Sequence, residues 1–481
     1  MLSDGLKYQD SRMATCEEMK QDLAPFALHD AAAKSKGGPV LLRDGDTVYT
    51  DPSDSHSLIV GDTGSMKTLR FVLPLIYSCA AADESMVIVD PKGELARKSE
   101  SFLSAKGYKT VIINMRDPQR SPDTWNPMGV IERGYKSGEE GQQKAVLQLN
   151  DMLNDIFFRR VDTKDPYWNE SAGQLALGIC LLLLALGEKL NMKNLLKWRY
   201  EKLADGTLDK CFRNLPTDGE IYQNLAGYLG MTAENTKSCI RSTFDQLVRV
   251  FKSAPALTEM LNDTSFDIER IGEAKAAVFV VIPDEKTTFH FLATLFISQC
   301  YTTLLETAER HGGSLPRRTN IILEEFCNLP ALGDIVPMIT AARSRNIRLH
   351  MVIQSYGQLV EKYGENVSRA ILDNCGNMIY LHTREMDFLT YISRLAGNNE
   401  YGRPLISTSR LQRLQKNETI IFRGRCCPYL AEDVPLIFDY PIKLGTELRS
   451  APQKPKKEKK RRRIGDVLKP PELSGDTDVW D

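Results

Sequence analysis

The sequence lacks the cysteine patterns and leader segments that mark zinc-binding and secreted proteins. Its ten cysteines include the adjacent Cys426 and Cys427 but no C-x-x-C pair, and with only six histidines they give no zinc-ligand spacing. Residues 1–20 are polar and of mixed charge, unlike a signal peptide. These absences favour reduced thiols in a cytosolic compartment.

Long apolar runs are also missing. The longest one, residues 175–187, has 13 residues between Gln174 and Glu188, whereas a membrane-spanning helix needs about 18 to 20. We therefore expect a buried helix here and no transmembrane helix in this chain. The expected location is the cytoplasm, or the cytoplasmic face of the cell membrane as a peripheral protein.

An excess of charge is absent from the chain as a whole. The net charge is −1, so binding to nucleic acid would need local clusters of Lys and Arg. One cluster, KPKKEKKRRR at residues 454–463, carries eight basic residues against Glu458. It lies in a segment, 446–481, that we expect to be a disordered charged tail. The cluster could contact DNA or an acidic membrane surface, although solvated disorder is the more frequent state of such runs.

Short apolar runs alternate with helical patterns, which predicts a mostly parallel sheet covered by helices. The predicted strands are residues 57–60, 86–90, 110–113, 278–282, 321–323, 349–353 and 378–381. Between Gly129 and Ala276 the alternation gives way to helical periodicity with few β-rich runs. The sequence therefore predicts an α/β fold with a helical insertion.

A phosphate-binding loop is predicted directly after the first of these strands, where it would open a helix. Its backbone N–H groups would surround the phosphates of ATP, Lys67 would contact the β- and γ-phosphates, and Thr68 would bind Mg²⁺. Glycine is usual at the position of Met66, because a Cβ often has no room there. Taken alone, the pattern also fits an ordinary turn rich in small residues. The loop consists of Gly61, Asp62, Thr63, Gly64, Ser65, Met66, Lys67 and Thr68.

Two adjacent acids end a later apolar strand, in the sequence IILEEF. In P-loop ATPases the first acid holds Mg²⁺ through water and the second polarises the attacking water. Glu324 would take the metal role and Glu325 the role of the base, although aspartate is commoner at the first position. A surface acidic pair at a strand end is the alternative.

Two further polar residues follow the acidic pair. Gln354 ends the next predicted strand, where it could sense the γ-phosphate, and Arg343 ends a helix, where it could reach the nucleotide of a neighbouring subunit. Both positions also suit solvated side chains, and an arginine near a helix C-terminus interacts favourably with the helix dipole.

Six segments together resemble the coupling ATPases of conjugative DNA transfer and type IV secretion. Their order and spacing match that family over roughly residues 10 to 445. Family members usually carry N-terminal membrane helices, and this chain shows no stretch long enough. The segments are HSLIVGDTGSMKT (56–68), VIVDPKGEL (87–95), WNP (125–127), KDPYWNESA (164–172), IILEEFCNLP (321–330) and AARSRNIRLHMVIQS (341–355).

The resemblance implies a RecA-like nucleotide-binding domain interrupted by an all-α domain that recognises cargo. It implies a homo-hexamer that binds ATP and Mg²⁺ and passes DNA, expected to be single-stranded, or nucleoprotein. Its partners would be relaxase or relaxosome proteins and a secretion-channel or membrane-anchoring protein. The expected divisions are a loop-rich leader (1–55), the two parts of the nucleotide-binding domain (56–138 and 271–445), the all-α domain (139–270) and the tail (446–481).

By the same resemblance, Lys67 and Thr68 bind ATP and Mg²⁺, Glu324 and Glu325 form the acidic pair, Arg343 is an arginine finger and Gln354 the sensor. The segment DPKGEL (90–95) also matches the family, but we assign it no catalytic role because a helix-starting turn explains it.

Two alternatives to an ATP-driven translocase remain. Met66 and Glu324 depart from the usual motifs and could each slow hydrolysis, which would suit an ATP-binding receptor or scaffold for cargo proteins. A soluble relative of the motor acting in defence against invading DNA is the other alternative.

Overall fold

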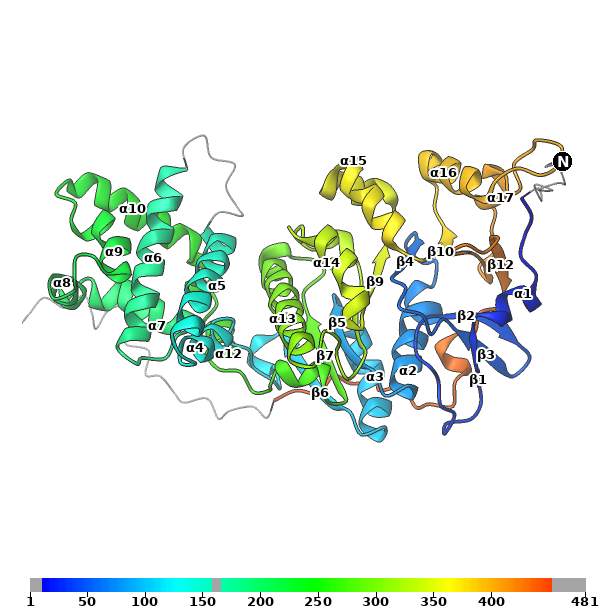
Figure 1. Cartoon of the computed structure of the whole chain (residues 1–481), viewed down its shortest axis with the longest axis horizontal. Helices are drawn as coiled ribbons and strands as arrows, with labels where there is room; N and C mark the ends of the chain where they lie inside the picture. The colour runs from blue at the N-terminus through cyan, green and yellow to red at the C-terminus, as the bar shows by residue number, and fades with distance from the viewer. Residues whose placement is uncertain (1–10, 158–165, 452–481) are drawn as a thin grey trace, which may run out of the picture.

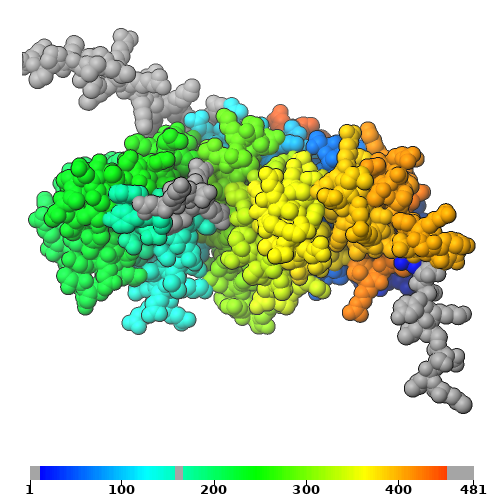
Figure 2. Space-filling model, turned by 90° about the horizontal axis from the view of Figure 1, so that it is seen from above, coloured from blue at the N-terminus to red at the C-terminus, as the bar shows by residue number. Residues whose placement is uncertain are grey.

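The computed structural model describes residues 11–157 and 166–451. Figure 1 shows a helical region at one end of an elongated molecule and a large sheet with flanking helices in the rest. In Figure 2 the same helical region, in green, lies opposite the C-terminal helices and strands, in orange. The basic cluster at 454–463 and most of the predicted tail lie outside the described residues.

All seven strands predicted from the sequence are present, and they form the parallel part of a nine-stranded sheet in the order β12-β11-β10-β4-β9-β8-β5-β7-β6. β11 and β12 add an antiparallel edge next to β10. The strands of this sheet are β4 (Ser57–Gly61), β5 (Ser85–Asp90), β6 (Lys109–Asn114), β7 (Ala276–Val281), β8 (Thr319–Leu323), β9 (Ile347–Ile353), β10 (Asn377–His382), β11 (Glu418–Arg423) and β12 (Tyr429–Glu432).

The sheet is buried on both faces because successive side chains of a strand point to opposite sides and both sets are apolar. In β4, for example, Leu58 and Val60 join one hydrophobic cluster and Ile59 the other. The prediction of an α/β fold with a mostly parallel sheet is confirmed. Helices cover the two faces: α2 (Leu73–Ala81), α3 (Glu94–Ala105), α13 (His290–Arg310), α14 (Ile335–Ala342), α15 (Tyr356–Asn374), α16 (Met386–Ala396) and α17 (Thr408–Leu411).

The N-terminal segment contains regular structure that the sequence analysis missed. Where we expected a loop-rich leader, three short antiparallel strands pair in the order β1-β3-β2 and pack with α1 against the face that carries α2. The strands are too short and too interrupted by turn-forming residues to give a clear alternating pattern. These elements are α1 (Cys16–Gln21), β1 (Ala24–Ala27), β2 (Val40–Asp44) and β3 (Thr47–Thr50).

The helical region lies between β6 and β7, as the loss of strand periodicity predicts, and it begins with α4. Its described part contains the one-turn π-helix η3 (Trp198–Lys202) and nine α-helices: α4 (Gly129–Tyr135), α5 (Glu139–Phe157), α6 (Tyr167–Ala185), α7 (Met192–Lys197), α8 (Thr207–Arg213), α9 (Glu220–Leu229), α10 (Glu234–Leu247), α11 (Arg249–Ser253) and α12 (Pro255–Met260). Whether it is a separate domain with the boundaries 139–270 stays a prediction.

Helix α6 contains the longest apolar run and is longer than that run suggests. Its 19 residues make it the one helix in the described ranges that is long and apolar enough to cross a membrane by length and composition, which corrects the expectation that no stretch is long enough. It is also a core helix, since 67% of its most apolar window is buried in the structure. The expectation of a buried helix is therefore confirmed.

The WNP segment connects the helical region to the sheet. Trp125 is fully buried, packs edge-on against Phe296 of α13 and donates a hydrogen bond from Nε1 to Gln299 Oε1 at 2.9 Å. Asn126 donates from Nδ2 to the carbonyl oxygen of Leu190, which follows α6. Trp125 thus ties the start of the helical region to α13, which covers the sheet, and Asn126 ties it to the segment after α6.

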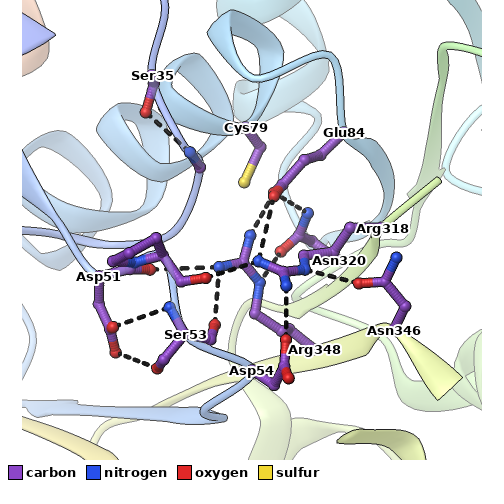
Figure 3. A network of polar contacts seen from close by, with 12 residues as sticks. Ser35, Asp51, Ser53, Asp54, Cys79, Glu84, Arg318, Asn320, Asn346 and Arg348 are labelled. Carbon is purple, nitrogen blue, oxygen red and sulfur yellow. Dashed lines mark hydrogen bonds and ion pairs between the residues drawn. The ribbon is translucent and has the colours of Figure 1, made fainter. Parts of the chain in front are cut away.

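A buried polar network lies at the amino ends of the parallel strands (Figure 3). The Arg348 guanidinium, 1% exposed, pairs with Glu84 and donates to Asn320 Oδ1 at 3.0 Å. Arg348 also donates to the backbone carbonyl oxygens of Asp51 and Ser53. The network therefore joins β9, β8, the turn before β5 and the N-terminal segment.

We expect Arg348→Met to lower the free energy of unfolding by about 3 to 5 kcal/mol, because it leaves the buried Glu84 carboxylate with only the longer ion pair to Arg318, at 3.7 Å. Adding Glu84→Gln should recover much of this loss by removing the poorly compensated charge. Urea denaturation measures both, with Arg384→Met on the exposed surface as a control expected to change stability by less than about 0.5 kcal/mol. Equal loss in the single and double variants would contradict the charge argument.

Candidate functional site: the carboxyl edge of the parallel sheet

The predicted site residues from three parts of the chain meet at one edge of the sheet. The neighbouring strands β10, β4, β9, β8 and β5 are parallel, so their carboxyl ends lie side by side. β4 leads into the phosphate-binding loop, β9 ends at Gln354, and β8 ends at Glu324 and Glu325. Clefts at the carboxyl ends of parallel strands are the usual ligand sites of such sheets.

The loop after β4 has the form of a phosphate cradle. A Cβ added to Gly61 would approach Ser65 Oγ to 2.5 Å, so the close turn requires glycine there, and Gly64 has a φ of 85° that favours glycine. Ser65 closes the turn by donating from Oγ to the Asp62 carbonyl oxygen at 2.7 Å. Among the described residues, the backbone N–H groups of Thr63, Gly64 and Met66 have no hydrogen-bond partner. They remain available to an anion.

Met66 keeps the backbone conformation that glycine usually provides. Its φ is 67°, in the left-handed region where a residue with a Cβ is strained by roughly 1 to 2 kcal/mol. The structure thus retains the shape of the loop at the cost of local strain. The one-turn π-helix η1 (Thr68–Val72) follows and continues into α2.

Lys67 and Thr68 point into the site. Lys67 Nζ donates to the carbonyl oxygens of Gly61 and Asp62, the latter at 2.9 Å, and burial lowers the pKa of this amine. Thr68 Oγ1 donates to Glu324 Oε1 at 2.7 Å. This bond joins residues 256 positions apart in the sequence and places the two proposed magnesium ligands together.

Glu324 is held in a strongly desolvating position. Burial, and next the charge of Asp90, raise its pKa to about 8, while the hydrogen bond from Thr68 lowers it. Asp90, at the end of neighbouring β5, is fully buried, and burial raises its pKa to about 6. The half-buried Glu324 carboxylate beside the Thr68 hydroxyl forms a pair of oxygen ligands that suits Mg²⁺.

Glu325 has a different environment from Glu324. Its backbone is left-handed, with a φ of 53°, and Oε2 accepts from Asn328 Nδ2 at 2.6 Å. Lys92 Nζ lies 3.6 Å from Oε1. The side chain is 18% exposed, so the carboxylate is held by two partners at the mouth of the site, where a water molecule can reach it.

Gln354 lies beside the phosphate-binding loop, where its Oε1 accepts from Thr63 Oγ1 at 3.4 Å. Arg343 does not. It is exposed in η7 (Arg343–Arg345), just before β9, and therefore at the amino edge of the sheet. Its charge adds to the burial that lowers the pKa of His56, which precedes β4 at that edge. Arg343 can serve a nucleotide only in a neighbouring subunit.

The sequence analysis missed three residues of this edge. His382, at the end of β10, lies with Nδ1 2.9 Å from Asp62 Oδ2, and its carbonyl oxygen accepts from the Asp62 N–H. Nothing near Asp62 in the sequence signals a partner 320 positions away. Lys92 and Asn328 lie inside segments that had been singled out, but only the fold shows that both contact Glu325.

The arrangement fits a magnesium nucleotide. Free backbone N–H groups and Lys67 would hold the phosphates, Thr68 and Glu324 would hold the metal, and Glu325 is placed to polarise water. When bound, Mg²⁺ would neutralise charge that develops on the phosphates.

A comparison with known families agrees with this geometry. The family model described as "Type IV secretory system Conjugative DNA transfer" matches residues 9–425. The chain belongs to this family. The resemblance inferred from the six sequence segments is thereby confirmed.

Curated relatives in the family are distant. The conjugal transfer protein TraG of Rhizobium radiobacter is 22% identical over 417 residues, which cover 82% of this chain and 62% of that protein. The protein VirD4 of Agrobacterium fabrum (strain C58 / ATCC 33970) is 23% identical over 392 residues, 78% of this chain and 54% of VirD4. The chain thus spans about three-fifths of the length of the curated relatives that it matches.

Among solved structures, the fold is similar to that of the plasmid coupling protein TrwB. TrwB in complex with a non-hydrolysable ATP analogue has a TM-score of 0.61 at 18% identity and covers 88% of this chain and 92% of TrwB. TrwB with ADP and Mg²⁺ has a TM-score of 0.61 at 17% identity, with the same coverage. The chain therefore has the fold of a nucleotide-binding coupling protein.

The strain at Met66 leads to a first prediction for the site. Met66→Gly should raise the free energy of unfolding by about 1 kcal/mol, because glycine adopts this φ without steric cost, and should tighten binding of ATP. Met66→Ala is the matched control, since it removes the side chain but keeps the strained Cβ, and should bring no such gain. Thermal melting and nucleotide titration measure both. Equal gains in the two variants would assign the effect to the methionine side chain.

The burial of Glu324 leads to a pH prediction. The folded protein keeps a proton on this carboxyl up to about pH 8, while the unfolded chain loses it near the ordinary value of 4.5. The contribution of Glu324 to stability is therefore present at low pH and is lost as the pH rises through this window.

Glu324→Gln, which cannot ionise, should accordingly melt higher than the parent by a few degrees at about pH 8 and by little at about pH 5, both without nucleotide. The exposed Glu361→Gln on α15 is the matched control. The same pH trend in both variants would show that the burial of Glu324 is not its cause.

Proposed function

We propose that the chain is an ATP-hydrolysing coupling protein of conjugative DNA transfer or type IV secretion. The observation that carries this proposal is the hydrogen bond between Thr68 and Glu324, which closes a phosphate-binding loop onto an acidic pair at one sheet edge. Membership of the conjugative DNA-transfer family and the fold shared with TrwB support the biological setting.

In this proposal, Lys67 binds the β- and γ-phosphates, Thr68 and Glu324 hold Mg²⁺, and Glu325 is the general base. Gln354 contacts the loop and senses the γ-phosphate. Glu325 suits its role because Asn328 and Lys92 fix its carboxylate while leaving it partly exposed. Hydrogen-bonded positioning of this kind is what places a base within reach of its water.

Arg343 would complete the site of a neighbouring subunit. Its exposure at the amino edge supports a finger acting in trans, as in a homo-hexameric ring. The proposed partners are DNA, most simply a single strand, together with relaxase or relaxosome proteins that dock on the helical region. A channel or membrane-anchoring protein would hold the ring at the cytoplasmic face of the cell membrane.

The alternative of an ATP-binding receptor with weak or no hydrolysis keeps one observation in its favour. Met66 is strained in the loop, and strain in the nucleotide-free loop alters how readily the loop accepts phosphates. The receptor would bind ATP at the phosphate-binding loop and cargo at the helical region, but it would not hydrolyse the ATP.

Steady-state ATP hydrolysis with and without single-stranded DNA separates the two functions. We expect DNA to stimulate turnover, and Glu325→Gln to reduce it by about 100-fold or more while ATP still binds, because loss of a general base typically costs 10² to 10⁴ in rate. Lys67→Ala should lose binding as well.

The control is Glu201→Gln, the same change on the exposed surface of the helical region, which should hydrolyse ATP like the parent. Binding of ATP without turnover, with or without DNA, would instead establish the receptor. Turnover that Glu325→Gln does not reduce would remove Glu325 from the mechanism.

A further inference from the structure

The turn after β5, Asp90–Leu95, has so far been explained only as the start of α3. Asp90 does fill that role, since its Oδ2 accepts from the backbone N–H of Ala96 at 2.8 Å. This hydrogen bond uses one of the two carboxylate oxygens. The other oxygen, Oδ1, takes no part in this hydrogen bond.

Asp90 Oδ1 is buried and has no hydrogen-bond partner among the described residues. Burial raises the pKa of Asp90, and the backbone N–H groups of Ala96, Leu95, Lys92 and Glu94, which face the carboxylate, lower it. Of these groups, Ala96 donates the hydrogen bond with good geometry, and it does so to Oδ2. A buried acceptor left unsatisfied destabilises the folded protein. Such atoms in native structures mark places that a water, ion or ligand completes.

The sheet register places Asp90 at the proposed nucleotide site. Val89 of β5 pairs with Leu323 of β8, so the next residues, Asp90 and Glu324, lie side by side at the carboxyl edge. The same turn reaches the second acid as well, because Lys92 Nζ lies 3.6 Å from Glu325 Oε1. The turn thus forms a wall of the site opposite the phosphate-binding loop.

We propose that Asp90 is a positioning residue of the magnesium site, whose Oδ1 accepts a hydrogen bond from a water ligand of Mg²⁺ beside Thr68 and Glu324. Mg²⁺ in nucleotide sites keeps several water ligands, and carboxylates that bind such ligands orient them and strengthen metal binding. This inference rests on the proposed binding of magnesium nucleotide.

Asp90→Asn separates this role from the role in starting α3. Its amide oxygen can still accept from the Ala96 N–H, so the turn is preserved. Its amide nitrogen then occupies the place of Oδ1 and can only donate. The variant therefore loses the acceptor that the proposal requires and keeps the cap.

The test is binding of a fluorescent ATP analogue to the full chain, measured in EDTA and across a series of MgCl₂ concentrations. We expect Asp90→Asn to need about 10-fold more Mg²⁺ for half-maximal enhancement of binding, with binding in EDTA and the melting temperature as in the parent. The matched control is Glu94→Gln, which removes one negative charge from the same turn at a side chain that pairs with Lys98. It should keep the magnesium midpoint of the parent.

An unchanged midpoint in Asp90→Asn would overturn the proposal and leave Asp90 as a cap alone. An equal shift in Glu94→Gln would also overturn it, since general charge in the turn would then be the cause. If Asp90→Asn does not fold, Asp90→Ser, whose hydroxyl can cap α3, takes the same test with the same expected shift. A parent that binds no analogue under any condition would instead refute the proposed function, and the inference with it.

Discussion

The parallel register of β4, β9, β8 and β5 is the constraint on which the site depends. Gln354 and Glu324 follow directly after the last paired residues of β9 and β8, and Asp90 is the last paired residue of β5, so the level of pairing decides which side chains meet. A shift of one residue would turn each side chain to the other face of the sheet. The apolar residues that fill both faces therefore fix the site as well as the core, because they allow only one register.

The same edge concentrates features that cost free energy in the nucleotide-free protein. Met66 and Glu325 are two of the five non-glycine residues with positive φ in the described ranges. Glu324, which is half-buried, and Asp90, which is buried, are carboxylates with raised pKa values. Strained backbone and buried charge persist only where the surrounding structure holds them, and they gather at functional sites. The buried Arg348 network at the other end of the strands supplies part of that rigidity.

Much of this could be predicted from the sequence because the signals are local. The seven parallel strands are short apolar runs bounded by turns, and the loop 61–68 and the acids at 324 and 325 follow such runs directly. The strands β1–β3 and β12 were missed because their four or five residues give too short a pattern, and the mostly buried β11 was missed because it holds only three consecutive apolar residues, Ile420–Phe422. The pairing of His382 with Asp62 and of Lys92 with Glu325 could not be predicted, since it depends on strand order. Glu324 was predicted because it follows an apolar strand, but its hydrogen bond with Thr68 becomes visible only in the folded structure.

The place of the helical region has a consequence for how such proteins can diversify. Both of its chain connections are to β6 and β7, the last two strands of the sheet on the side away from β10. A connection between adjacent parallel strands needs a minimum length but has no upper limit of size, provided that it runs from the carboxyl end of the first strand back to the amino end of the second. The helices can therefore be enlarged, shortened or exchanged in evolution without altering the register of β4, β9, β8 and β5, so the region that we propose for cargo and the site that we propose for ATP can change independently.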